Sequence, residues 1–449
     1  MHTSHWHFQI LLFAFLLLSG CGQNSSDKTG DIPVIDIIGN LGNYEAVSVS
    51  QFATELEYIP LETSYDCLIG EEYVGVIVTS TYIFVRGSKY CYAFDRDGRF
   101  LGQIGSYGQG PGEYTHLTSF TMDEKSQSLY LETSRTLLEY SWDGVFRQSI
   151  DLPKNKHETN LHDVSFVRDN LFIGHSPNYK GDLLYNFVLF DQSSEMIKLF
   201  DNYVQFNHPQ GMVAWTDRSM NPYRIGERIY VKEFSNDTLF SLTEENELVP
   251  HFVFDIGKYT TTKEMREYSP VNDILNGKHP EVIRIPLDAY LPMIGTHNHV
   301  FFSIRAYSLS GKFPFPQKRI ILRPTVLPPG AQLTGPTVSR DLVGIYDMAN
   351  QTTHLLDTDP ASRMLGLIND LDGGLSFWPR YYTSDNELVD IWLVEDMKKL
   401  LTEEYFASHE IKAPAAYQKL KKLMQKLDEE DNPVIVIAKL RPELIGENR

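Results

Sequence analysis

Two histidines hold matching positions in the sequence and could supply metal ligands. His116 and His162 lie 46 residues apart, each just before a predicted strand. Imidazole nitrogens are common metal ligands near neutral pH, so two of them at the mouth of one channel could bind a metal ion or a small ligand. The alternative, which we favour, is that each ring caps a strand by hydrogen bonding to a neighbouring unit. The sequence names no third ligand.

A second candidate is a group of oxygen donors at Asn369, Asp370 and Asp372. Carboxylate and amide oxygens are the ligands that Ca²⁺ prefers, so Asn369 and Asp370 could hold a cation near an inner strand at the channel mouth. Asp372 and the glycine after it also make an ordinary turn pair. We predict no cofactor, and Ca²⁺ or another divalent metal is the one class that these donors would suit.

Common signatures of enzymes do not occur. The sequence contains no Gly-x-Ser-x-Gly, His-Glu-x-x-His or Cys-x-x-Cys pattern. The glycine-rich run from Gly102 to Gly112 leads into a predicted strand, whereas a phosphate-binding loop needs a helix after it. We therefore predict a binding or scaffolding module. A metal-assisted hydrolase or lyase at the channel mouth is the alternative, because such a site can be assembled from distant loops.

The elements that would position these residues repeat along the chain. Alternating polar and apolar residues predict short strands, and Asp-Gly pairs ending at Gly98 and Gly144 predict tight hairpins. A fixed period of this kind indicates an array of like modules. The residues that keep the 46-residue period are His116, Phe120 and Asp123 with His162, Phe166 and Asp169, and Phe94 to Phe100 with Tyr140 to Phe146.

We predict six sets of four strands. The first four sets cover 73–104, 117–150, 163–200 and 220–256, and the fifth begins near 291 and includes 342–346. The sixth has strands at 366–371, 376–378 and 433–438, interrupted by a helix from Pro414. We favour packing of its apolar stripe on the body over a partner-binding face. Two excursions separate these strands: 258–289, with a short helix near 262–268, and the proline-rich stretch 312–338.

Six radial sheets of four strands make an all-β fold, a six-bladed β-propeller, which limits unpaired edges by closing a ring. The sixth set lacks an outermost strand, while the predicted strand at 55–61 has no set of its own. We therefore expect strands from the N- and C-terminal ends of the chain to pair and close the last blade. Buried apolar residues such as Leu56 and Ile59 would stabilise that pairing.

Length and charge narrow the class of protein. The chain has 449 residues, of which 42% are hydrophobic, and this is too long for one ordinary core. It carries 59 acidic against 40 basic residues, a net charge of -19. Such a charge repels phosphate backbones, so we expect no nucleic-acid partner.

The first residues have the pattern of an export signal. An apolar run from Ile10 to Leu18 is too short to span a bilayer but suits a secretory signal peptide. Leu18-Ser-Gly-Cys21 resembles the lipobox of bacterial lipoproteins, which implies lipidation of Cys21 and a place in the cell envelope. An ordinary signal peptide with a chance cysteine is the alternative. We expect a signal peptide at 1–20, a flexible tether at 21–30 and the propeller at 31–449, with the outer membrane favoured over the inner.

Two further cysteines, Cys67 and Cys91, would lie in a compartment that permits a disulfide. We favour two small buried hydrophobic residues over a bridge. Aromatic platforms near predicted strand ends could contact a protein, peptide or glycan ligand, although packing between blades is their more ordinary role. These platforms are Trp215, Tyr307 and Trp378, with Arg380 beside the last.

The chain also resembles a known family. Phe94 to Gly105 followed by Gly108 to Tyr114 looks like the blade-to-blade segment of NHL-type repeats. More closely, the chain is similar to bacterial six-bladed β-propeller lipoproteins of unknown function, through Tyr58 to Glu62, Asn236 to Phe240 and Asn432 to Ile437. The resemblance covers nearly all of the chain after Cys21. It implies the fold and an envelope address, but no activity.

Overall fold

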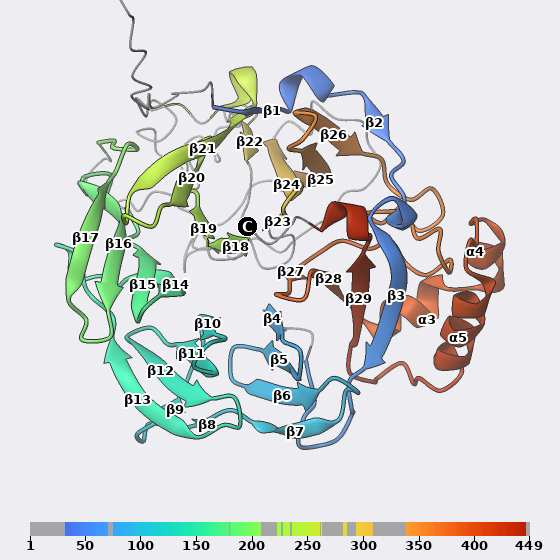
Figure 1. Ribbon diagram of the computed structural model, residues 1–449, viewed down its shortest axis with the longest axis horizontal. Helices are drawn as coiled ribbons and strands as arrows, with labels where there is room; N and C mark the ends of the chain where they lie inside the picture. The colour runs from blue at the N-terminus through green and yellow to red at the C-terminus, as the bar shows by residue number, and fades with distance from the viewer. Residues whose placement is uncertain are drawn as a thin grey trace, which may run out of the picture. The chain divides into compact units, whose positions relative to one another are not determined.

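Short strands with buried faces follow one another from Gly75 onward, as the alternating sequence predicts. They form six sheets set around a common centre, a six-bladed β-propeller (Figure 1). The computed structural model describes residues 32–70, 75–178, 180–207, 222–225, 228–233, 236–260, 262, 282–284, 293–308 and 338–445.

Blades one to three each have four antiparallel strands, numbered from the innermost outward. Blade one holds β4 (Gly75–Val78), β5 (Tyr82–Arg86), β6 (Cys91–Asp95) and β7 (Phe100–Gln103). Blade two holds β10 (Ser119–Asp123), β11 (Ser128–Glu132), β12 (Thr136–Ser141) and β13 (Phe146–Asp151). Blade three holds β14 (His162–Arg168), β15 (Leu171–His175), β16 (Tyr185–Asp191) and β17 (Met196–Asp201). Between blades one and two, β8 (Ser106–Tyr107) and β9 (Glu113–Tyr114) form a small parallel pair.

Blades four to six take strands from more than one part of the chain. Blade four holds β18 (Tyr223–Ile225), β19 (Arg228–Val231), β20 (Thr238–Leu242) and β21 (Leu248–Asp255). Blade five holds β22 (Val282–Arg284) and β23 (Ile294–Gly295), which both pair with β24 (His299–Ser308), then β25 (Val338–Asp347) and β26 (Thr352–Leu356). Blade six holds β27 (Tyr381–Tyr382), β28 (Glu387–Trp392), β29 (Val434–Leu440) and β3 (Ala53–Pro60).

The residues that keep the 46-residue period pack one blade on the next. The Phe120 ring lies over Gly75 of blade one, where an added Cβ would come within 2.7 Å of it. Phe166 stacks on Tyr130 of blade two with ring centroids 5.9 Å apart. Asp123 accepts the backbone N–H of Lys125 at 3.0 Å and so shapes the turn after its strand. The 46-residue period therefore corresponds to the length of chain from one blade to the next.

The predicted hairpins at the Asp-Gly pairs are confirmed. Asp95 Oδ1 accepts the backbone N–H groups of Asp97 and Arg99, both at 2.9 Å. Gly98 and Gly144 have φ angles of 83° and 87°, in the left-handed region that favours glycine. Both turns therefore join the third and fourth strands of a blade with the geometry that their sequence requires.

The two ends of the described chain close the ring, as predicted. β3 pairs antiparallel with β29, and Ile59 lies opposite Ile435. Leu56 and Ile59 are 5% and 3% exposed, and Ile435 is fully buried. The outermost strand of blade six is thus the N-terminal one, and the rest of that blade comes from the C-terminal part of the chain.

The segment before β3 adds strands to two more blades. β1 (Val34–Asp36) pairs parallel with β21 of blade four, and β2 (Tyr44–Glu45) pairs parallel with β26 of blade five. We call the stretch 34–60 the strap, because β1, β2 and β3 run along the outer edges of blades four, five and six in that order (Figure 1). Nothing in the sequence names the partners of β1 and β2.

A helical insertion joins β28 to β29, as predicted. It holds α3 (Val394–Leu400), α4 (Glu403–Ala407) and α5 (Pro414–Met424), which lie outside β3 (Figure 1). Pro414 stands at the first turn of α5, where its missing N–H has no cost. Leu420 and Leu427 are buried in the same cluster as Leu56, so the apolar stripe packs on the body.

The strands predicted at 366–371 and 376–378 are wrong. This stretch is a buried connection between blades five and six with only single bridges, such as Leu367 to Phe377. Its apolar residues are as buried as those of a strand, and a short apolar run does not distinguish the two. The blade is built instead from β27 and β28. The predicted helix near 262–268 and the proline-rich stretch 312–338 lie outside the described residues.

Cys67 and Cys91 are free thiols, each buried in a different core cluster, as favoured from the sequence. Burial raises the pKa of the Cys91 thiol to about 12, although Arg86 works in the opposite direction. In the parts of the chain that the structure covers, no helix is both long and apolar enough to cross a bilayer.

The closure can be tested by removing a buried side chain from β3. We expect Ile59→Ala to lower the free energy of unfolding by about 2–5 kcal/mol, because it leaves a cavity in the core cluster that β3 and β29 share with blade one. Glu57→Ala is the matched control, since that side chain is 42% exposed, and it should change stability by less than about 0.5 kcal/mol. Urea unfolding followed by tyrosine and tryptophan fluorescence measures both. Equal stabilities would contradict the closure.

Candidate functional site

The strands of each blade alternate in direction, so the connections fall on two faces. Links from second to third strand, and from each fourth strand to the next blade, share the face that carries the helical insertion, and we call it the insertion face. The tight turns between first and second and between third and fourth strands lie on the other, which we call the turn face. Each face holds one candidate site.

On the insertion face, the second strands of blades one to three end in buried polar residues. These are Arg86, Glu132 and His175, which are 4%, 0% and 6% exposed. Arg86 and Glu132 lie 46 residues apart and so keep the period of the repeat. Paired with His175 across the β14–β15 ladder is His162. One predicted site residue thus borders this group, which we call the polar cluster.

Glu132 joins blade two to blade three. Its carboxylate accepts the Thr118 hydroxyl at 2.9 Å and the backbone N–H groups of Asp163 and Val164 at 3.3 and 2.7 Å. Burial, and then the nearby Asp163 carboxylate, raise the pKa of Glu132 to about 8. A carboxyl group with such a pKa can give or take a proton near neutral pH.

Arg86, in the same polar cluster, bonds to the residue that follows His116. The Arg86 guanidinium donates to the Leu117 carbonyl at 3.1 Å and lies 5.6 Å from the centre of the Phe120 ring. The Arg86 Nε has no partner among the described residues, and burial lowers the pKa of the Arg86 guanidinium. His116 precedes Leu117 and is exposed. His162 thus borders the polar cluster, whereas His116 is exposed beside it in the chain, and a metal or ligand at these two histidines stays a prediction.

His175 is the buried histidine that the sequence did not single out. Burial, and then the neighbouring His162, lower its pKa to about 3, so the ring is neutral. Its Nδ1 has no partner in the described part of the chain. Across the described ranges, no three His, Cys, Asp or Glu side chains gather closely enough to hold a metal ion.

Asn369 and Asp370 lie against the strap. Asn369 donates to Asp372 at 2.7 Å and to the Tyr58 hydroxyl of β3 at 3.3 Å. Asp370 accepts the Ser50 hydroxyl at 2.6 Å and lies 2.7 Å from the Lys412 ammonium. Lys412 already neutralises the carboxylate that a divalent cation would need. These bonds tie the connection between blades five and six to the strap and to the insertion.

A further buried pair fastens the insertion. His409 Nε2 lies 3.2 Å from the Asp359 carboxylate, which also accepts the Tyr405 and Ser362 hydroxyls at 2.9 and 2.6 Å. The bond to Asp359 raises the pKa of His409. Burial would raise the pKa of Asp359, but the bonds from His409 and Ser362 lower it overall. A charged pair results at mildly acidic pH.

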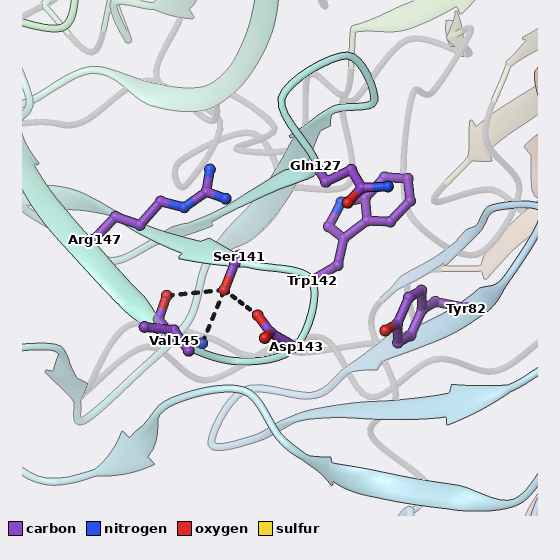
Figure 2. Close-up of a pocket in the computed structure, with 7 residues that line it drawn as sticks. All are labelled: Tyr82, Gln127, Ser141, Trp142, Asp143, Val145 and Arg147. Atoms are coloured by element: carbon purple, nitrogen blue, oxygen red, sulfur yellow. Dashed lines mark hydrogen bonds between the residues drawn. The ribbon is translucent and has the colours of Figure 1, made fainter.

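On the turn face, a pocket of about 520 Å³ lies between blades one and two. Tyr82 of β5 forms one wall, and the turns of blade two form the rest (Figure 2). The Tyr82 and Trp142 rings meet edge to face with centroids 5.9 Å apart. The lining is Tyr82, Gln127, Ser141, Trp142, Asp143, Val145 and Arg147.

Polar groups of the pocket are held by their neighbours. Ser141 donates its hydroxyl to Asp143 and accepts the backbone N–H of Val145 at 3.1 Å (Figure 2). Arg147 forms an ion pair with Glu139 at 3.3 Å. The indole N–H of Trp142 is the exception, because it is buried and has no partner among the described residues. An unpaired buried donor is costly, so a ligand acceptor there would be stabilising.

The same position in blade one shows why the pocket exists. Arg96 lies 46 residues before Trp142, in the equivalent turn, and its guanidinium forms an ion pair with Glu387 of blade six at 3.2 Å. It also donates to the Thr79 carbonyl at 2.9 Å. Blade one thus has paired polar groups where blade two has Trp142 beside Tyr82.

Sequence reasoning missed this pocket. Trp142 stands inside the repeated turn that was read as a hairpin signal, and the exchange of an arginine for a tryptophan at that position was the available clue. Of the aromatic platforms predicted, Trp378 is 3% exposed and packs on Phe301 at 5.7 Å. Trp215 and the side chain of Tyr307 lie outside the described residues.

Comparison with known proteins agrees with the fold. A family model described as a domain of unknown function, DUF4934, matches residues 32–439. A Bacteroides fragilis protein whose description suggests export is 17% identical with a TM-score of 0.60, over 91% of this chain and 99% of that one. A member of the DUF4221 family from Bacteroides vulgatus is 11% identical with a TM-score of 0.46, over 87% and 97%. No curated protein matches. At these identities the likeness bears on the fold alone.

The His409–Asp359 pair predicts a pH dependence. Because folding raises the pKa of His409, the protonated ring stabilises the folded protein fully below pH ~6.5, the pKa of an unfolded histidine. This contribution is lost as the pH rises through the folded pKa. Because folding lowers the pKa of Asp359, its carboxylate stabilises the folded protein above pH ~4, the pKa of an unfolded aspartate. This contribution is lost as the pH falls through the folded pKa. His409→Gln should therefore cost about 1–3 kcal/mol near pH ~5.5 and less near pH ~9.

Thermal unfolding at the two pH values measures this difference. His354→Gln is the matched control, because His354 pairs with Glu45 where both side chains are at least 36% exposed. It should change stability little at either pH. A cost for His409→Gln that is the same at both pH values would exclude the charged pair.

Proposed function

We propose that this chain, which belongs to the DUF4934 family, is an envelope-anchored binding protein whose turn-face pocket takes an uncharged, hydroxyl-rich ligand such as a saccharide. The observation that carries the proposal is the buried indole N–H of Trp142, which has no acceptor among the described residues and belongs to a pocket with a second aromatic wall. Aromatic rings pack on the apolar face of a sugar ring, and hydroxyls can accept from an N–H donor.

The charges of the pocket support an uncharged ligand. Its lining has one carboxylate, Asp143, and one guanidinium, Arg147. Arg147 is already paired with Glu139, so an anion would find no free cation. The Gln127 amide and the Ser141 hydroxyl can each both donate and accept. A ligand with many hydroxyls matches this mixture better than a phosphate or an ammonium compound does.

The envelope anchor is the second half of the proposal, and it rests on the lipobox pattern ending at Cys21. A lipid on that thiol would hold the propeller close to a membrane. From residue 21 to residue 33, a fully extended chain would reach at most roughly 40 Å. A binding module on such a short tether samples ligands next to the membrane surface.

The pocket is tested with sugars of similar size that differ in charge. We expect saturable binding of glucose or galactose, measured by calorimetry, and at least about tenfold weaker binding to Trp142→Phe, which loses the N–H donor and one ring. Asp143→Asn should weaken the same sugars less. Asp97→Asn is the matched control, because it occupies the equivalent turn of blade one away from the pocket and should bind as the wild type does.

Glucosamine and glucuronate complete the test as the cationic and anionic counterparts. Tighter binding of either would contradict an uncharged ligand. If no neutral sugar binds, or if Trp142→Phe binds as tightly as Asp97→Asn, the pocket does not serve this function.

Lipidation is tested by Cys21→Ser in cells that process bacterial lipoproteins. The wild type should enter the detergent phase on Triton X-114 partition and incorporate labelled palmitate. The variant should do neither, because serine offers no thiol. The same partition by both proteins would overturn the anchor and leave the pocket untouched.

A further inference from the structure

Exposed large apolar side chains gather at the outer edge of blade three. β17 is the last strand of that sheet, and three of its six residues are apolar and nearly half exposed. The edge strand of blade two differs, because Arg147, Gln148 and Ser149 hold the middle of β13. The exposed group on blade three is Leu184, Met196, Ile197, Leu199 and Tyr203, each at least 46% exposed. We call it the blade-three edge.

The next two blades cover the same edge with an added strand. β1 of the strap lies parallel to β21 in blade four, and β2 lies parallel to β26 in blade five. An outermost strand in this protein therefore accepts a short parallel strand twice. No described strand lies on the outer side of β17.

The covered strands and β17 end in the same way. β1 pairs with Val253-Phe-Asp255 at the end of β21, and β2 pairs with Leu355 and Leu356 at the end of β26, directly before Asp357. β17 ends in Leu199-Phe-Asp201, again two apolar residues and an aspartate. Blade two has Ser149-Ile-Asp151 at this place, with a polar first residue. Blade three thus has the ending that receives a strand elsewhere.

The backbone N–H and C=O groups of β17 that face away from the sheet correspond to those of β21. In β21, the Val253 N–H donates to the Pro33 carbonyl, and the Asp255 carbonyl accepts from Ile37, both at 3.1 Å. In β17, the next residue, Asn202, donates inward to the Leu184 carbonyl at 2.9 Å. Because backbone groups alternate along a strand, Leu199 N–H and the Asp201 carbonyl face outward, as their counterparts in β21 do.

A hollow beside the strand would receive a side chain of the added segment. It has a volume of about 190 Å³ and lies between blades three and four. Leu199, Tyr203 and Phe240 form its apolar part, and Lys198 and Glu247 close one side with an ion pair. Tyr203 and Phe240 stack with centroids 6.2 Å apart.

We propose that the blade-three edge binds an extended segment of another protein as an added parallel strand, in the way that β21 binds β1. The segment carries two consecutive aliphatic residues, as Val34 and Ile35 do in β1. Main-chain hydrogen bonds to Leu199 and Asp201 fix its register, and its apolar side chains cover Ile197 and Leu199. This surface is separate from the turn-face pocket and does not depend on its ligand.

The probe is a fluorescein-labelled peptide with the sequence of residues 32–38, which contains β1, and the protein is the full mature chain. We expect saturable binding by fluorescence anisotropy. Leu199→Pro removes the outward N–H and should weaken binding at least about fivefold. Ser149→Pro is the matched control, because it makes the same change at the outward position of β13 and should bind as the wild type does.

A second variant guards against misfolding of Leu199→Pro. Ile197→Glu with Leu199→Glu keeps the backbone, removes the exposed apolar surface and should weaken the peptide by a similar factor, with an unchanged melting temperature. Three results overturn the proposal: no saturable binding to the wild type, equal binding to wild type and both variants, or a wild-type dimer in sedimentation that Leu199→Pro makes monomeric. The last would assign the edge to a second copy. Trp142→Phe should bind the peptide normally, so failure of the pocket is read separately.

Discussion

The pairing of β3 with β29 is the constraint on which the rest of the structure depends. It joins residues from opposite ends of the described chain without a covalent bond, and Ile59 lies opposite Ile435. The entropy cost of closing such a loop rises only slowly, by about 0.6 kcal/mol for each doubling of its length. Buried side chains on both strands offset that cost. With the ring closed, each blade has two neighbours, and both the polar cluster and the pocket between blades one and two depend on such neighbours.

Most residues that keep the 46-residue period have the same structural role in each blade, and a few differ between blades. Phe120 and Phe166 fill the gap to the preceding blade, and Asp95 shapes its turn. At other repeated positions the side chain changes while the backbone does not. Arg96 in blade one forms an ion pair, whereas Trp142 in blade two lines a pocket. A repeat of this kind supplies the same frame several times and allows one copy to differ.

The sequence predicted the fold better than the site. The 46-residue period, the Asp-Gly hairpins, an unassigned strand at 55–61 and a sixth set without an outermost strand were enough to predict six blades and their closure. The first strands of blade six were misplaced because 366–378 is apolar and short, which suits a buried connection equally well. The partners of β1 and β2 could not be predicted, since two or three residues carry too little pattern to name an edge. His116 and His162 were recognised by their period, but Glu132 and Arg86, which bond to the nearby Val164 and Leu117, were hidden among strand residues.

The strap has a consequence for biosynthesis. Its three strands are the first part of the propeller to be synthesised, whereas their partners β21, β26 and β29 come progressively later, the last ending at Leu440. Translation proceeds from the N-terminus, so β1 stays unpaired until β21 has been made, β2 until β26, and β3 until β29. Blade six is completed last, once β29 has been made. A chaperone that holds apolar strands apart during this interval would therefore act first on the strap.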